Sequence, residues 1–120
     1  MKVKISDIVN SRPILEEMNN TRLSIPTAYK VHKLVEESNI VLQAFEKERH
    51  ELLEVHAKKS KDGKQYVFAK TGKAKEKFAA SIKEMLEAEV DFPDISVSET
   101  ELESFSIMPG SVSSISWFLK

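Results

Sequence analysis

Lysines and aromatic rings concentrate in one stretch of the 120-residue chain, residues 58–77. This stretch holds eight lysines against two acidic residues, and Tyr66 and Phe68 lie among the lysines. Ammonium groups attract anions and aromatic rings stack on nucleobases, so the combination is typical of a site for a nucleotide or a nucleic acid. The same composition also suits a solvated loop between two helices, or a surface that attracts an acidic region of another subunit.

The three histidines do not have the spacing of a metal site. His50 and His56 are six residues apart and His32 is distant from both, whereas a helical zinc pair usually has its histidines four residues apart. The chain has no cysteine, which excludes disulfides, thiolate catalysis and Cys-ligated metals. We therefore expect no metal site, and we expect the histidines to lie on a helix surface or in a helix seam.

Acidic residues and serines are numerous, but no catalytic pattern connects them. Glu46 precedes His50 by four residues and His50 precedes Glu54 by four, so pairing along one helix face accounts for these groups. No Gly-x-Ser-x-Gly sequence occurs, and three glycines are too few for a phosphate-binding loop of the usual kind. We expect a protein that is not an enzyme and that uses no cofactor.

The composition is that of one small globular domain over residues 1–120. With 41% hydrophobic and 31% charged residues, the 13.6 kDa chain has enough apolar surface for one core. The 18 basic residues nearly balance 19 acidic ones, which argues against a general nucleic-acid or membrane-surface binder. No apolar run approaches the roughly 20 residues that span a bilayer, and the first residues become polar too early for a signal peptide. We expect a cytoplasmic protein.

The strongest structural pattern predicts a long helix over about residues 26–57. Ser24 and Pro26 suit the first turn, and no further glycine or proline follows before residue 57. Steps of three and four residues form a heptad seam over four repeats, with some imperfect core positions: Ala28, Val31, Val35, Ser38, Leu42, Phe45, Arg49, Leu52 and His56. Such a rod measures roughly 45 Å. It is longer than a compact domain needs, so we expect part of it to pack on another chain.

A second long helix is expected over about residues 72–90. Its apolar residues share one face: Ala74, Phe78, Ile82, Met85 and Leu86. The two helices, joined by a basic tip over residues 58–71, predict an antiparallel helical hairpin. Within the tip, Asp62-Gly63 before the β-prone residues 65–68 predicts a small β-hairpin or an open loop.

Shorter elements are expected before the long helix. Residues 2–5 alternate basic and apolar side chains, as a strand with one solvated face does. Ser6 is placed to cap a helix over about residues 7–18. Pro13 lies inside that helix, so we expect a kink or a split near Arg12.

The C-terminal third also contains short elements. Residues 92–97 are typical of an edge strand and could pair with the N-terminal strand. Ser98 and Glu101 have the spacing of a capping box. Pro109 begins a last element over residues 110–119, for which we favour a short helix over a strand. The predicted fold is therefore mainly α (α+β), a long helical hairpin with a short N-terminal helix and a minor two-stranded β patch.

Three segments occur in a characteristic order along nearly the whole chain. They are residues 2–9 (KVKISDIV) with residues 12–15 (RPIL), residues 25–30 (IPTAYK) and residues 44–49 (AFEKER), followed by the acidic region and the final element that begins with proline. In this order they resemble a family of small tailed-phage and prophage proteins of uncharacterised function. The resemblance implies a viral origin and a setting inside an infected bacterium, and it assigns no catalytic residue.

Two functional hypotheses follow. The first is a homo-oligomeric phage accessory protein, most simply a two-fold dimer, that sequesters an anionic nucleotide signal of host antiviral defence. Its site would join basic and aromatic groups between subunits, and the candidate ligand-binding residues are Arg12, Tyr29, Lys33, Lys64, Tyr66 and Lys70.

The second hypothesis is a structural or assembly protein of the virion, such as a chaperone or connector. Residues 84–119 hold eight acidic residues and no basic one, so this region complements the basic tip between subunits. Such a protein would bind a larger phage protein or a host protein.

Overall fold

Helices make up most of the computed structural model, which describes residues 1–59, 66–68 and 73–120. Its helices are α1 (Ile5–Asn19), α2 (Ile25–His56), α3 (Ala74–Glu87), the 3-10 helix η1 (Pro109–Ser111) and α4 (Val112–Ile115). Its strands are β1 (Lys2–Lys4), β2 (Lys58–Lys59), β3 (Tyr66–Val67) and β4 (Glu89–Asp91). The predicted fold class, mainly α with a minor β patch, is confirmed.

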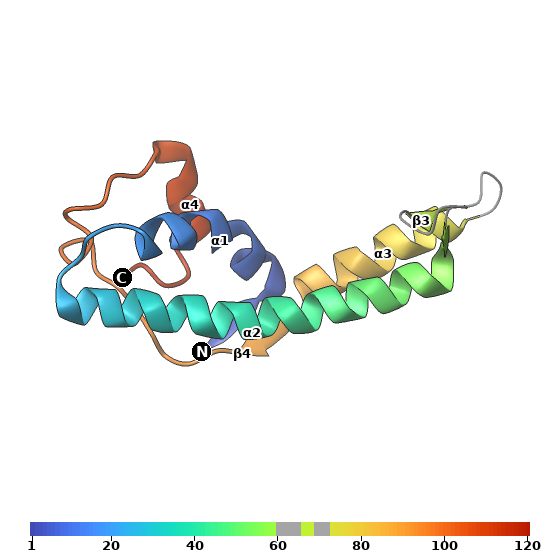
Figure 1. The fold of residues 1–120 in the computed structure, drawn as a ribbon, viewed down its shortest axis with the longest axis horizontal. Coiled ribbons are helices and arrows are strands. Elements are labelled where there is room, and N and C mark those ends of the chain that lie inside the picture. The colour runs from blue at the N-terminus through green and yellow to red at the C-terminus, as the bar shows by residue number, and fades with distance from the viewer. Residues whose placement is uncertain (60–65, 69–72) are drawn as a thin grey trace.

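The long helix α2 runs along the whole molecule, which measures 54 × 29 × 25 Å. Figure 1 shows α1 and α4 over its N-terminal half and α3 running back beside its C-terminal half. We call residues 1–45 and 88–120 the head, and residues 46–59, 66–68 and 73–87 the arm. The arm is the predicted antiparallel hairpin, and the other packed elements belong to the head.

Helix α1 starts earlier than predicted and is not interrupted. Lys4 occupies the N-cap position and Ser6 lies within the first turn, so the predicted Ser6 cap is wrong. The helix continues through Pro13, so of the two predicted alternatives near Arg12 the split is wrong, whereas the kink stays a prediction. Ile8 and Leu15, on either side of the proline, are buried in the core, and such packing stabilises a helix more than local propensity does.

Helix α2 confirms the predicted long helix, with Pro26 in its first turn. Its buried residues recur at steps of three and four: Thr27, Val31, Leu34, Ser38, Leu42 and Phe45. Five positions of the predicted seam are not buried: Ala28 is exposed, and the other four are only half-buried, namely Val35, Arg49, Leu52 and His56. A helix of 3.6 residues per turn drifts from a strict seven-residue repeat, so one straight stripe cannot stay buried over its whole length.

The N-terminal strand pairs with a different segment from the one predicted. Strand β1 is antiparallel to β4, with Val3 opposite Val90, whereas residues 92–97 were expected as the partner. Helix α3 ends at Glu87 rather than near residue 90, which leaves the next residues free to form the strand. Pro93 has no backbone N–H and cannot extend the ladder. Val97 instead forms an isolated parallel bridge with Leu119.

At the end of the arm, β2 and β3 pair antiparallel, so the β-hairpin alternative for the tip is confirmed. The predicted Asp62-Gly63 turn lies outside the described residues. Helix α3 is shorter than the predicted 72–90, and its apolar face is half-buried throughout: Ala74, Phe78, Ile82, Met85 and Leu86.

Two predictions for the C-terminal third are confirmed. In the capping box, the Glu101 N–H donates to Ser98 Oγ at 3.1 Å and the Ser98 N–H donates to Glu101 Oε1 at 3.2 Å. The last element is helical, with η1 leading into α4, although these helices end at Ile115 and not near residue 119.

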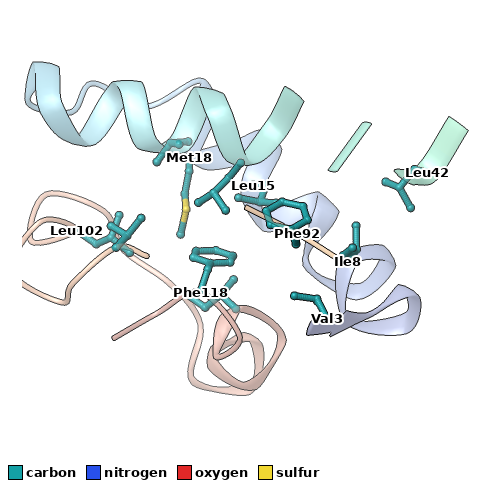
Figure 2. Close-up of a cluster of buried hydrophobic side chains, with 12 residues drawn as sticks. Val3, Ile8, Leu15, Met18, Leu42, Phe92, Leu102 and Phe118 are labelled. Carbon is teal, nitrogen blue, oxygen red and sulfur yellow. The ribbon is translucent and has the colours of Figure 1, made fainter. Parts of the chain in front are cut away.

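The hydrophobic core lies in the head. Figure 2 shows Phe118 beside Leu15 and Met18 of α1, with Phe92 close by, and all four side chains are buried. Trp117 packs edge-on against Phe92, with ring centroids 5.1 Å apart. In contrast, α3 has no buried residue. Burial of apolar surface therefore stabilises the head much more than the arm.

Candidate functional site

The candidate ligand-binding residues do not converge within one chain. Tyr29 and Lys33 lie near the start of α2, whereas Tyr66 lies in β3 beyond its end. At 1.5 Å per residue, the stretch of helix from Lys33 to His56 alone separates them by about 35 Å. Lys64 and Lys70 lie outside the described residues. A site that includes all the candidates therefore needs more than one subunit, and it stays a prediction.

Tyr29 and Lys33 lie one helical turn apart and line the same open groove. The groove has a volume of about 480 Å³, and its other lining residues are Lys30, Asp94, Ile95 and Ser96. The Tyr29 side chain is 74% exposed, so the face of its ring is accessible. An exposed ring within reach of two ammonium groups is a suitable place for a planar anionic ligand to stack.

The two lysines of this groove already have carboxylate partners. Lys33 Nζ lies 3.0 Å from Glu37 Oε1, and this hydrogen bond, with the charge of Glu37, raises the pKa of Lys33. Lys30 Nζ donates to both carboxylate oxygens of Glu101, at 2.8 and 2.9 Å. Both ammonium groups are held in place, and an anionic ligand has to share them with these carboxylates.

Arg12 lines a different groove, between α1 and α2. Its Nε lies 3.1 Å from Glu16 Oε1, one turn along the same helix. The neighbouring lining residues come from the middle of α2: Asn39, Leu42, Gln43 and Glu46. The structure therefore does not join Arg12 to Tyr29 and Lys33 within one subunit.

Sequence reasoning missed a third surface, a groove along the arm between α2 and α3. It has a volume of about 680 Å³ and combines apolar and acidic lining: Glu48, Glu51, Leu52, Val55, Ser81, Glu84, Met85 and Ala88. Val55 is 75% exposed although it is apolar. The sequence signal for this groove is the helical spacing of apolar residues and glutamates on both predicted helices. These residues form one surface only because α2 and α3 pack side by side.

The histidines of α2 pair with glutamates one turn further along. His32 Nε2 lies 2.9 Å from Glu36 Oε1, and His50 Nε2 lies 3.2 Å from Glu54 Oε1. Both histidines are more than half exposed, as expected for a helix surface. Over residues 1–59, 66–68 and 73–120, no group of three or more histidines and carboxylates is placed to hold a metal ion.

Comparisons with known protein families, with curated proteins and with solved structures find no match. In the part of the chain that the structure describes, no helix combines the length and the hydrophobicity of a membrane span. The candidate binding surfaces of the molecule are the Tyr29 groove, the Arg12 groove and the arm groove.

Proposed function

We propose that this chain is a non-enzymatic binding protein that acts as a homo-oligomer. The main observation behind this proposal is that the apolar face of the arm is only partly covered by the rest of the chain. Helix α3 has a well-defined apolar face, yet none of its residues is buried. Because helices in proteins are stabilised mainly by burial of such a face, the arm favours a second layer supplied by another polypeptide.

We further propose an anionic nucleotide as the ligand. The exposed ring of Tyr29 beside Lys33 supports this class, since aromatic rings stack on bases and ammonium groups attract phosphates. Tyr66 would come from a neighbouring subunit, because within one chain most of the length of α2 separates β3 from Tyr29. Lys64 and Lys70, which lie outside the described residues, stay predicted members of the same site. The resemblance to phage proteins supports a role in the cytoplasm of an infected bacterium, where the protein would sequester a nucleotide signal of antiviral defence.

The nucleotide proposal is tested by thermal unfolding of the full chain with a panel of linear and cyclic nucleotides. A ligand at 100 times its Kd stabilises the folded state by about 2.7 kcal/mol, which corresponds to about 10 °C in Tm for a domain of this size. We expect at least one nucleotide to raise Tm. Tyr29→Ala and Lys33→Glu should abolish the shift, whereas Lys47→Glu, an exposed charge reversal elsewhere on α2, should keep it. No shift with any nucleotide contradicts this ligand class.

The second candidate is an assembly component of the virion. The acidic stretch over residues 84–119 and the basic arm tip support it, because opposite charges on one chain promote contacts between copies. This function predicts that the protein occurs in virions or in assembly intermediates of the phage. Its absence from both, measured by mass spectrometry of purified particles, counts against it.

A further inference from the structure

We propose that the arm groove between α2 and α3 binds an amphipathic helix of a different protein, one whose apolar stripe is bordered on both sides by lysines or arginines. The inference goes beyond the homo-oligomer and its ligand. It assigns a further surface and the chemistry of the partner that this surface fits.

The floor of the groove is apolar. Leu52 of α2 and Met85 of α3 are half-buried, and Val55, three residues after Leu52, is 75% exposed. Ser81 and Ala88 have small side chains, so a third helix can approach the pair closely. Covering this floor removes apolar surface from water, and the flexible methionine adapts its shape to a partner.

Both rims of the groove are acidic. Glu51 directly precedes Leu52, and Glu84 directly precedes Met85. One residue turns an α-helix by about 100°, so the exposed carboxylates of Glu51 and Glu84 lie at the edges of the groove while Leu52 and Met85 form its floor. Glu48 adds a third carboxylate to the α2 rim, and the lining contains no basic residue.

The three rim glutamates differ from other glutamates of α2 in their pairing. Glu46 pairs with Arg49 and Glu54 pairs with His50, whereas within the described residues none of the three forms an ion pair. Their charge repels phosphates, and two copies of the same groove would set carboxylates against carboxylates. The complementary partner is therefore a polypeptide that brings cations.

A helix is the form of polypeptide that this geometry fits. Two packed helices leave a groove into which a third helix can insert its apolar side chains. When its stripe lies on the floor, the residues on one border lie over the α2 rim and those on the other border over the α3 rim. Lysine or arginine on both borders pairs with the carboxylates, while the methylene groups cover the edges of the floor.

The groove leaves most of the apolar face of α3 to the homo-oligomer. Met85 lines the groove, whereas Phe78, Ile82 and Leu86 do not. These three side chains are half-buried, so they still offer apolar surface to a second copy. The binding of a partner helix and the formation of the oligomer can therefore be measured separately.

The chemistry of the partner is tested with fluorescently labelled peptides of about 18 residues. The probe has leucines at helical spacing and lysines on both borders of the leucine stripe. One control peptide replaces the lysines by glutamates, and another contains the probe residues in scrambled order. Fluorescence anisotropy with the full chain at low salt should show the probe binding at least about tenfold more tightly than either control.

Three results of this experiment overturn the proposal. Equal binding of the scrambled peptide contradicts a helical partner. Equal binding of the glutamate peptide contradicts the role of the rim carboxylates. No binding of the leucine-lysine probe at any concentration contradicts the docking surface itself.

The acidic rims are tested by charge reversal. Glu51→Lys with Glu84→Lys should weaken binding of the probe at least about tenfold at low salt, and less at high salt. Glu17→Lys with Glu99→Lys changes the net charge equally at exposed positions of the head and should leave binding nearly unchanged. Equal weakening by the two pairs would show a general charge effect and would overturn the assignment of the groove.

The apolar floor is tested by Val55→Ser, which should weaken binding of the probe about tenfold. Ile40→Ser is the matched control, because Ile40 is on the same helix, is 61% exposed and does not line the groove. Circular dichroism checks that both variants keep their helices. Unchanged binding by Val55→Ser overturns the assignment of the floor.

Sedimentation equilibrium of wild type and Val55→Ser separates this inference from the proposed function. We expect the same oligomer for both proteins. Loss of the oligomer in Val55→Ser assigns the groove to a second copy of this chain and overturns the different partner. A monomeric wild type that binds the leucine-lysine probe overturns the homo-oligomer and supports the docking surface.

Discussion

Ser38 lies on the buried face of α2, where it is 2% exposed. Within the described structure its hydroxyl has no hydrogen-bond partner, and an unsatisfied buried hydroxyl costs free energy. Ser38→Ala should therefore raise the free energy of unfolding by about 1 kcal/mol, helped by the higher helix propensity of alanine. Urea denaturation measures the change.

Ser11→Ala is the control for this prediction. Ser11 is also buried in a helix, but its Oγ donates to the carbonyl oxygen of Ile8 at 3.0 Å. Its replacement loses that hydrogen bond and should give no gain in stability. A Ser38→Ala variant that is less stable than wild type contradicts the account of Ser38.

Glu101 makes the stability of the head depend on pH. Its hydrogen bonds with Lys30 and then with Ser98 hold the pKa of the Glu101 carboxyl below its ordinary value. A carboxyl whose pKa is lower in the folded state stabilises that state above its unfolded pKa, and this stabilisation disappears as the pH falls through the folded pKa. The contribution is therefore complete at neutral pH and lost in acid.

Glu101→Gln should accordingly unfold more easily than wild type at pH 7, and the difference between the two proteins should shrink as the pH falls below about 4. Glu103→Gln removes the same charge from an exposed neighbour and serves as the control. Urea denaturation over a series of pH values gives the comparison. A difference between Glu101→Gln and wild type that stays constant down to pH 2 would contradict the assignment.

At the scale of elements, the head and the arm differ in how much they bury. Phe118 is fully buried in the head, whereas Phe78 of α3 is half-buried and meets the ring of Phe68 at a centroid distance of 5.3 Å. Phe118→Ala should cost about 3–5 kcal/mol and Phe78→Ala clearly less. Chemical denaturation of dilute protein distinguishes them, and equal losses would contradict the division into head and arm.

The elements that the sequence predicts correctly are those with a long, one-sided apolar pattern. Helix α2 has such a pattern with Pro26 at its start, and α3 has a recognisable apolar face. The pairing of β1 with β4 could not be predicted, because no glycine or proline marks the end of α3 and the partner strand is selected by tertiary packing. The split at Pro13 did not occur for the same reason, since the core on both sides of the proline maintains α1.

At the scale of the whole molecule, the sequence identifies the candidate groups but not their distances. Tyr29 and Lys33 share a groove because they are one helical turn apart, a relation that sequence spacing contains. Arg12 and Tyr66 are separated from them by the way the helices pack and by the length of α2, which sequence spacing does not contain. The arm groove likewise exists only once α3 lies against α2.

Native mass spectrometry of the full chain, isolated from the cells that produce it, tests most directly whether this protein is a homo-oligomer that binds a small anionic ligand. We expect an even-numbered oligomer that releases a nucleotide-sized mass when it is denatured. A monomer with no bound mass, under solution conditions that keep the head folded, would contradict it.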